Sequence, residues 1–135
     1  MSSNLLPETV STICEALSST DTTTQYPEAW KQLDVQRKQG GHFCDVTFTV
    51  KTKTFHAHQC VLAAVSKYFS GLFQSELSKS LDIDLSDFSE DVVAVLLDAI
   101  YCGVDVKTVD LVELLRLAEY VSYEWLVDAL IEAIR

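Results

Sequence analysis

The chain has 135 residues, 48% of them hydrophobic, with only two prolines and four glycines, which is typical of one globular domain with its own core. Its net charge of −10 arises in residues 76–135, which carry 14 acids and four bases, whereas residues 1–75 carry six of each. Because no basic stripe could neutralise phosphates, direct binding to nucleic acid or to an anionic membrane is excluded. The acidic half is either a set of solvated helix faces or a surface that steers a basic partner.

The apolar residues and the cysteines indicate a soluble intracellular protein. No apolar run approaches the roughly 20 residues that span a bilayer, and the N-terminus has neither the basic start nor the apolar block of a signal peptide. The cysteines stand at positions 14, 44, 60 and 102 and form no Cys-x-x-Cys pair. We therefore expect reduced thiols, with no zinc ribbon and no disulfide framework.

The first part of the chain divides into an arm and the start of a folded domain. Residues 1–25 are rich in Ser and Thr and are predicted to form a flexible arm, in which 7–17 fits either a short helix or a strand. The domain is predicted to span residues 26–135 and to begin with a helix that ends at Gly40. This helix has few apolar residues, so its Trp30 indicates a face that another surface covers.

The middle of the chain is predicted to form a hairpin, two short helices and a third strand. Apolar residues alternate with polar ones in both arms of the hairpin and in the third strand, as expected for half-buried strands. The predicted ranges are 44–50 and 54–58 for the hairpin, 60–65 and 67–74 for the helices, and 81–85 for the third strand.

The rest of the chain is predicted to form three amphipathic helices. The first follows Ser89 as its N-cap and ends at Gly103, and the other two span 109–120 and 123–134. In the last helix, the aromatic residues are expected to pack in the core or, alternatively, to line a partner surface; they are Tyr123 and Trp125.

The expected fold class is α+β, with a small three-stranded sheet capped by a cluster of five to six helices. Strands and helices are segregated along the chain instead of alternating. The sequence therefore does not imply a βαβ nucleotide-binding fold.

Residues 40–71 carry an ordered set of motifs that closely resembles the core of the BTB/POZ domain family. The matching segments are Cys44-Asp45-Val46, Phe55-His56-Ala57-His58, Leu62-Ala63-Ala64 and Ser66-Lys67-Tyr68-Phe69. The family's first helix is similar to Leu33-Asp34-Val35-Gln36-Arg37, and its Tyr-Thr-Gly is similar to Tyr101-Cys102-Gly103. The resemblance covers residues 25–135 and implies the BTB/POZ fold and a protein–protein interaction domain that is not an enzyme and needs no cofactor.

The resemblance also implies a homodimer, in which the first helix and the helix after the hairpin pack across a two-fold axis. The interface residues that it implies are Trp30, Leu33, Arg37, Asp45, His58, Gln59 and Leu62. Gln59 replaces the basic partner that the family's groove Asp usually has, so Asp45 needs other donors. Many family members also exchange an N-terminal strand between protomers, for which the pattern of residues 1–24 gives weak support.

Two partner-binding roles are implied by the resemblance. Family transcription factors recruit corepressors or form larger assemblies, and family adaptors bring substrates to a cullin 3 ubiquitin ligase through a hydrophobic-x-Glu element. Here Leu77 supplies the hydrophobic residue, but Lys79 stands where Glu is expected, a charge reversal that opposes this contact. With Gln36-Arg37 in the first helix, this favours a nuclear transcriptional regulator over a cytoplasmic cullin 3 adaptor. The predicted partner surface comprises Phe73, Leu77, Ser78, Lys79 and Tyr101.

Two alternatives come from other classes of protein. A zinc site or a Cys–His nucleophile fits the cluster Cys44, His56, His58 and Cys60, but no orienting group or oxyanion site is recognisable. We therefore predict no catalytic, cofactor-binding or metal-binding residues. The other alternative is a Skp- or elongin-C-like monomer, because those proteins share the fold.

Overall fold

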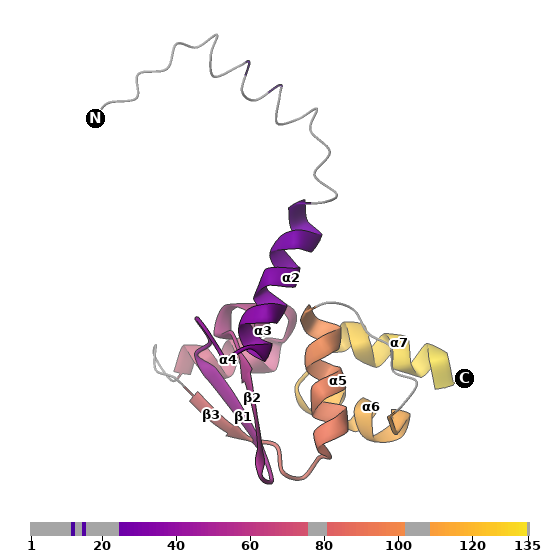
Figure 1. Ribbon diagram of the computed structural model, residues 1–135. Helices are drawn as coiled ribbons and strands as arrows, with labels where there is room; N and C mark the ends of the chain where they lie inside the picture. Colours follow the sequence, from indigo (N-terminus) through magenta and orange to yellow (C-terminus); the bar gives the residue numbers. More distant parts are fainter. Residues whose placement is uncertain (1–11, 13–14, 16–24, 76–80, 102–108, 135) are drawn as a thin grey trace.

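The computed structural model describes residues 12, 15, 25–75, 81–101 and 109–134 (Figure 1). These residues form a three-stranded sheet and six helices, which confirms the predicted α+β class. In chain order the elements are α2 (Gln25–Lys38), β1 (Val46–Val50), β2 (Lys53–Ala57), α3 (Gln59–Val65), α4 (Lys67–Ser75), β3 (Leu81–Asp84), α5 (Glu90–Tyr101), α6 (Leu111–Tyr120) and α7 (Glu124–Ile134).

The sheet has the order β2-β1-β3, in which the central strand β1 is antiparallel to β2 and parallel to β3. Val46, Phe48 and Val50 on β1 are at most 2% exposed, and the residues between them are half-buried, as the alternation predicts. Lys51 begins the hairpin turn with a φ of 59°, the positive value that such turns need at their first position. Helices α3 and α4 make the crossover that a parallel strand requires.

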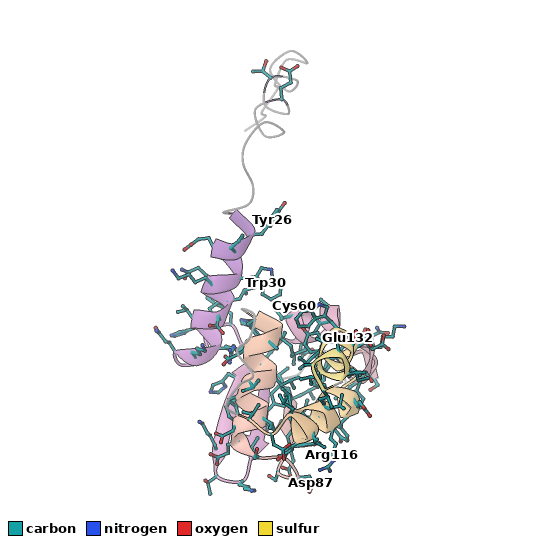
Figure 2. The ribbon with its side chains drawn as sticks, turned by 90° about the vertical axis from the view of Figure 1, so that its right-hand side faces the viewer. Tyr26, Trp30, Cys60, Asp87, Arg116 and Glu132 are labelled. Carbon is teal, nitrogen blue, oxygen red and sulfur yellow. The ribbon has the colours of Figure 1, made fainter. Side chains whose placement is uncertain are left out.

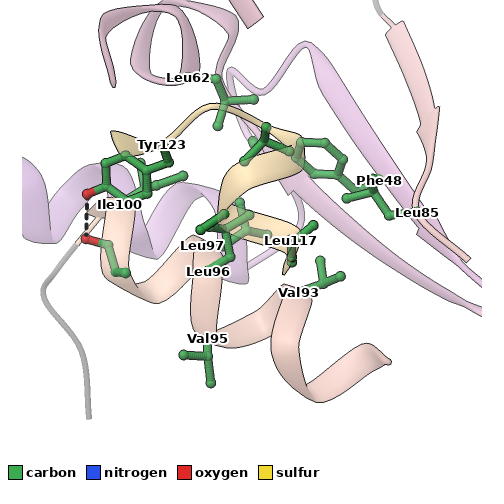
Figure 3. Close-up of a cluster of buried hydrophobic side chains, with 14 of the residues drawn as sticks. Phe48, Leu62, Leu85, Val93, Val95, Leu96, Leu97, Ile100, Leu117 and Tyr123 are labelled. Carbon is green, nitrogen blue, oxygen red and sulfur yellow. Dashed lines mark hydrogen bonds between the residues drawn. The ribbon is translucent and has the colours of Figure 1, made fainter. Parts of the chain in front are cut away.

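Helix α5 runs through the middle of the molecule and contacts α2, α3, α6 and β2. Four of its residues are at most 1% exposed, and Figure 3 shows α5 side chains packed with residues of the sheet, α3 and α6. These four are Val92, Val93, Leu96 and Leu97. A helix that is apolar on most of its sides is stable only when other elements surround it, so α5 forms the centre of the core.

Helix α2 lies partly outside this core. Figure 1 shows its first half projecting beyond the sheet and α5, whereas the helix as a whole contacts β2 and α5. Gly40 and Gly41 follow it with φ values of 87° and 69°, which confirms that glycines in the left-handed region end this helix. Within the described residues, the projecting half is therefore covered only in part, because Trp30 packs against the core while Tyr26 stays exposed.

Several predicted features lie outside the described residues. They are the arm at 1–24 apart from Thr12 and Glu15, the partner-surface residues Leu77, Ser78 and Lys79, and the helix end at Gly103. The boundary between arm and domain at 25/26 stays a prediction. No helix in the described part of the chain is long and apolar enough to cross a membrane.

Candidate interaction surfaces

Several residues predicted to form the interface meet at one junction, where α2, the start of α3 and the end of α5 come together. Tyr101 and His58 are only 2% and 4% exposed. The Tyr101 hydroxyl accepts a hydrogen bond from the His58 backbone N–H at 2.9 Å and lies 2.7 Å from His58 Nδ1. On the other side of the ring, His58 Nε2 lies 2.8 Å from Gln36 Oε1 on α2. One imidazole therefore links three helices.

The hydrogen bonds assign the protonation state of His58. Gln36 Oε1 can only accept a hydrogen bond, so Nε2 carries the proton of the neutral ring, and Nδ1 accepts from the Tyr101 hydroxyl. Burial lowers the pKa of His58; Asp45 raises it and Arg37 lowers it by smaller amounts. Burial also raises the pKa of Tyr101 far above its usual value, so the hydroxyl keeps its proton at neutral pH.

Arg37, a predicted interface residue, belongs to a buried ion-pair cluster. Its Nη2 lies 2.6 Å from Asp34 Oδ1 and 2.5 Å from Asp98 Oδ1, and its guanidinium carbon lies 4.8 Å from the centre of the Tyr101 ring. Lys38 Nζ joins the cluster, 3.0 Å from Asp34 and 3.5 Å from Asp98, and its hydrogen bond to Asp34 raises the pKa of Lys38. The cluster fixes the C-terminal half of α2 against α5.

Asp45 finds its donor in the backbone of the next helix. Its Oδ1 accepts a hydrogen bond from the Gln59 N–H at 2.7 Å, and Gln59 Nε2 lies 3.5 Å from the Asp45 carbonyl oxygen. This N–H is one of the donors that the first turn of α3 leaves without an intrahelical acceptor. A carboxylate from the residue before β1 thus stabilises the positive end of α3. Asp45 and Gln59 also line a shallow hollow of about 380 Å³ with Cys60 and Phe73.

The predicted site residues differ in the surface that they offer. Leu62 and Tyr101 are 0% and 2% exposed, so in this conformation neither side chain has surface left for a partner. Phe73 is 8% exposed, whereas Trp30 and Leu33 are half-buried on α2. The interface and partner surface as sets stay predictions.

The residues weighed for zinc binding do not converge. Both ring nitrogens of His58 are hydrogen-bonded, and Cys44 Sγ lies 3.7 Å from His58 Nε2 with burial raising the pKa of the thiol. Cys60 is exposed on α3. Within the described residues, no group of three His, Cys, Asp or Glu side chains could hold a metal ion.

The projecting half of α2 carries an aromatic surface. Tyr26 is 62% exposed, and Figure 2 shows it on the part of α2 that extends from the body. Trp30 packs edge-on against Tyr101 with ring centres 6.2 Å apart, and the two rings line a hollow of about 390 Å³ with Pro27, Lys31 and Asp34. We call Tyr26, Trp30 and this hollow the α2 patch.

A groove between the α3–α4 junction and the start of α7 was not found by sequence analysis. It has a volume of about 260 Å³, and Ala63, Ala64, Lys67, Glu124 and Trp125 are among the residues that line it. We call it the α7 groove.

Of the two alternatives for Tyr123 and Trp125, packing in the core holds for Tyr123, whereas Trp125 is exposed and stays a candidate for a partner surface. Tyr123 is 7% exposed and directs its hydroxyl toward the Ala99 carbonyl oxygen, whereas Trp125 is 60% exposed. Tyr123 stands just before α7, which begins at Glu124, whereas Trp125 lies in the first turn of this helix.

The described residues form a small α+β domain, and its α2 patch and α7 groove are surfaces of the kind that can contact other proteins. The chain matches the model of the BTB/POZ domain over residues 33–135, so it belongs to the BTB/POZ family. This domain is a protein–protein interaction module in zinc-finger transcription factors and in Kelch-like adaptors. The resemblance seen in the sequence is thus confirmed.

Similar proteins come from both of these groups. The BTB domain of zebrafish PATZ1 superimposes with a TM-score of 0.75 at 29% identity, covering 86% of this chain and 96% of that one. Human zinc finger and BTB domain-containing protein 14 is 38% identical over 82 residues, which are 59% of this chain and 18% of that protein. Mouse Kelch-like protein 8 is 36% identical over 91 residues, 64% of this chain and 14% of that protein. The chain thus spans less than a fifth of these two relatives.

Proposed function

We propose that this domain forms a homodimer through α2 and the start of α3, and that the dimer recruits a partner protein for a transcriptional regulator. The observation that carries the dimer is the α2 patch, in which Tyr26 is 62% exposed and Trp30 is only partly covered, by its contact with Tyr101. A two-fold interface uses the same patch twice, so two aromatic α2 faces can cover one another.

The junction below the patch supports this proposal. The Arg37–Asp34–Asp98 cluster and the hydrogen bonds of His58 hold the second half of α2 against α5 and α3. The direction of the projecting half is therefore set before a second copy arrives. A preorganised surface loses less conformational entropy on association.

Light scattering tests the dimer. We expect the wild-type domain to have the mass of two chains at micromolar concentration, and Trp30→Ala and Leu33→Asp to shift it toward one chain. Trp125→Ala is the matched control, because it removes the same side chain from an exposed site on α7. Circular dichroism verifies that each variant is folded. A monomeric wild type at tens of micromolar would defeat the proposal and favour the elongin-C-like alternative.

The α7 groove is the surface that we propose for the recruited partner. The small side chains of its two alanines allow close approach of a peptide backbone, and the exposed Trp125 ring offers apolar surface beside them. A reporter gene tests this role: the domain fused to a heterologous DNA-binding module should repress transcription, and Trp125→Ala should relieve repression while the variant remains dimeric. Unchanged reporter output with the wild-type fusion contradicts recruitment of a corepressor.

The role of a cullin 3 adaptor is the second candidate. It is favoured by the likeness to mouse Kelch-like protein 8 and by an exposed ring pair, Tyr68 and Tyr120, whose centres are 5.7 Å apart. Gln36 and Arg37 do not discriminate between the roles, because both bind residues inside the chain. Calorimetric titration with the N-terminal region of cullin 3 separates them. Micromolar affinity, strengthened further by Lys79→Glu, would establish the adaptor role in place of the regulator.

A further inference from the structure

A cleft of about 350 Å³ opens where the C-terminal end of α2, strand β2 and helix α5 meet. Polar donors surround it, namely Lys38, Lys53, Thr54 and His56, and the half-buried Phe55 and Ala94 form an apolar floor. Among the described residues that line the cleft, Asp98 is the one carboxylate. We call this the β2 cleft; it shares no lining residue with the α2 patch or the α7 groove.

The charge of the β2 cleft is opposite to that of the molecule. Arg37 and Lys38 are balanced by Asp34 and Asp98, with which they form ion pairs. Lys53 is exposed and forms no salt bridge within the part of the chain that the structure describes, and its ammonium lies 5.1 Å from the centre of the Phe55 ring. A chain with a net charge of −10 thus has a cationic concave surface with an apolar floor.

The backbone of β2 adds a recognition element. Among the strands of the described residues, β2 pairs only with β1, and its first residues Lys53 and Thr54 are exposed. An edge strand offers backbone donors and acceptors to an extended segment beside it, and alternate side chains of such a segment reach the same face. The ammonium groups that line the cleft come from Lys53 on β2 and from Lys38 on α2.

We propose that the β2 cleft docks an extended acidic segment of a partner protein. A carboxylate of the segment faces Lys53, and a neighbouring apolar side chain packs on Phe55 and Ala94. Charge complementarity selects an acidic partner, because the cleft is cationic while the surrounding molecule repels acidic chains at other positions. This surface is distinct from the proposed dimer contact and can be occupied in either oligomeric state.

The test uses a seven-residue peptide of alternating glutamate and valine, and its counterpart with glutamine in place of glutamate. In ¹⁵N-resolved NMR titrations at low ionic strength, the acidic peptide should shift the backbone amides of 53–56 to saturation. The glutamine peptide should leave them unchanged, and added salt should weaken the acidic complex. Lys53→Glu should reduce the affinity by about tenfold or more.

Lys67→Glu is the matched control, because it makes the same charge change on α4 beside the α7 groove. It should leave the affinity for the acidic peptide unchanged. Trp30→Ala should also leave this affinity unchanged, because Trp30 belongs to the proposed dimer contact and not to the β2 cleft. The proposal is overturned by a failure of the amides of 53–56 to shift, by equal losses in the two lysine variants, or by a Lys53→Glu domain that binds as the wild type does.

Discussion

The Tyr101 hydroxyl makes two hydrogen bonds to His58: it accepts from the backbone N–H and donates to Nδ1 of the ring. The other ring nitrogen, Nε2, binds Gln36. The sequence motif placed Tyr101 and Arg37 at contact surfaces, yet both side chains are used inside the chain. Arg37 pairs with Asp98 across 61 residues. A single sequence does not reveal which distant residues pair with each other. Motif matching therefore identified these residues but not the contacts that they make.

The first prediction concerns the pH dependence of stability. Burial lowers the folded-state pKa of His58, so below its unfolded value of about 6.5 the unfolded chain binds more protons than the folded one. The free energy of unfolding should therefore be highest above this pH and should decrease as the pH falls toward 5.5. Urea unfolding across this range measures the effect. His58→Gln should have a flatter profile, and identical profiles would show that other groups are responsible.

Gly41 gives a second prediction at the residue scale. Its φ is 69°, and a Cβ added there would lie 2.8 Å from Cγ of the His56 ring. Gly41→Ala should destabilise the fold by about 2 kcal/mol, through left-handed backbone strain and displacement of the ring.

Gly71 provides the matched control for this substitution. It lies in α4 with no heavy atom within 4 Å of an added Cβ, so Gly71→Ala should be neutral or stabilising by up to about 1 kcal/mol. Thermal unfolding of both variants checks the pair. Equal effects at the two glycines would contradict the assignment of strain to Gly41.

Among the elements, periodicity predicted most of the fold. The alternation at Val46, Phe48 and Val50 and the glycines after α2 each determine a local conformation, so hairpin and helices could be predicted from neighbouring residues. The parallel pairing of β3 with β1 could not be predicted in this way, because alternation identifies a strand without identifying the strand that pairs with it. The α7 groove was missed for a similar reason, since it joins elements far apart in the sequence.

The start of α6 gives a prediction at this scale. The sequence predicted a start at residue 109, whereas α6 begins at Leu111. The helix begins there because the Asp110 side chain accepts hydrogen bonds from the N–H groups of Val112 and Glu113, at 3.0 and 3.3 Å. Asp110→Ala should cost about 1 kcal/mol of unfolding free energy. Asp128→Ala, an exposed site within α7, should cost less in the same urea titration. Equal losses would show that charge, and not capping, is the cause.

In the molecule as a whole, the three surfaces are lined by different residues, although the α2 patch and the β2 cleft both use α2 and α5. The α2 patch extends from the body, the α7 groove lies beside the last helix, and the β2 cleft lies at the edge of the sheet. Because they share no lining residue, occupation of one leaves the other two open in a single copy. A domain of this family can therefore combine self-association with recruitment, provided that self-association occurs through the projecting helix.

Self-association through α2 should make the stability of the domain depend on protein concentration. If the folded domain is a dimer that dissociates on unfolding, mass action makes its stability depend on concentration, by about 1.4 kcal/mol per tenfold change. The urea midpoint should then rise between micromolar and hundred-micromolar protein. Trp30→Ala should remove this rise because it truncates the α2 patch, while Trp125→Ala should retain it. A wild-type midpoint that stays constant over this range would mean that α2 is covered by something other than a second copy.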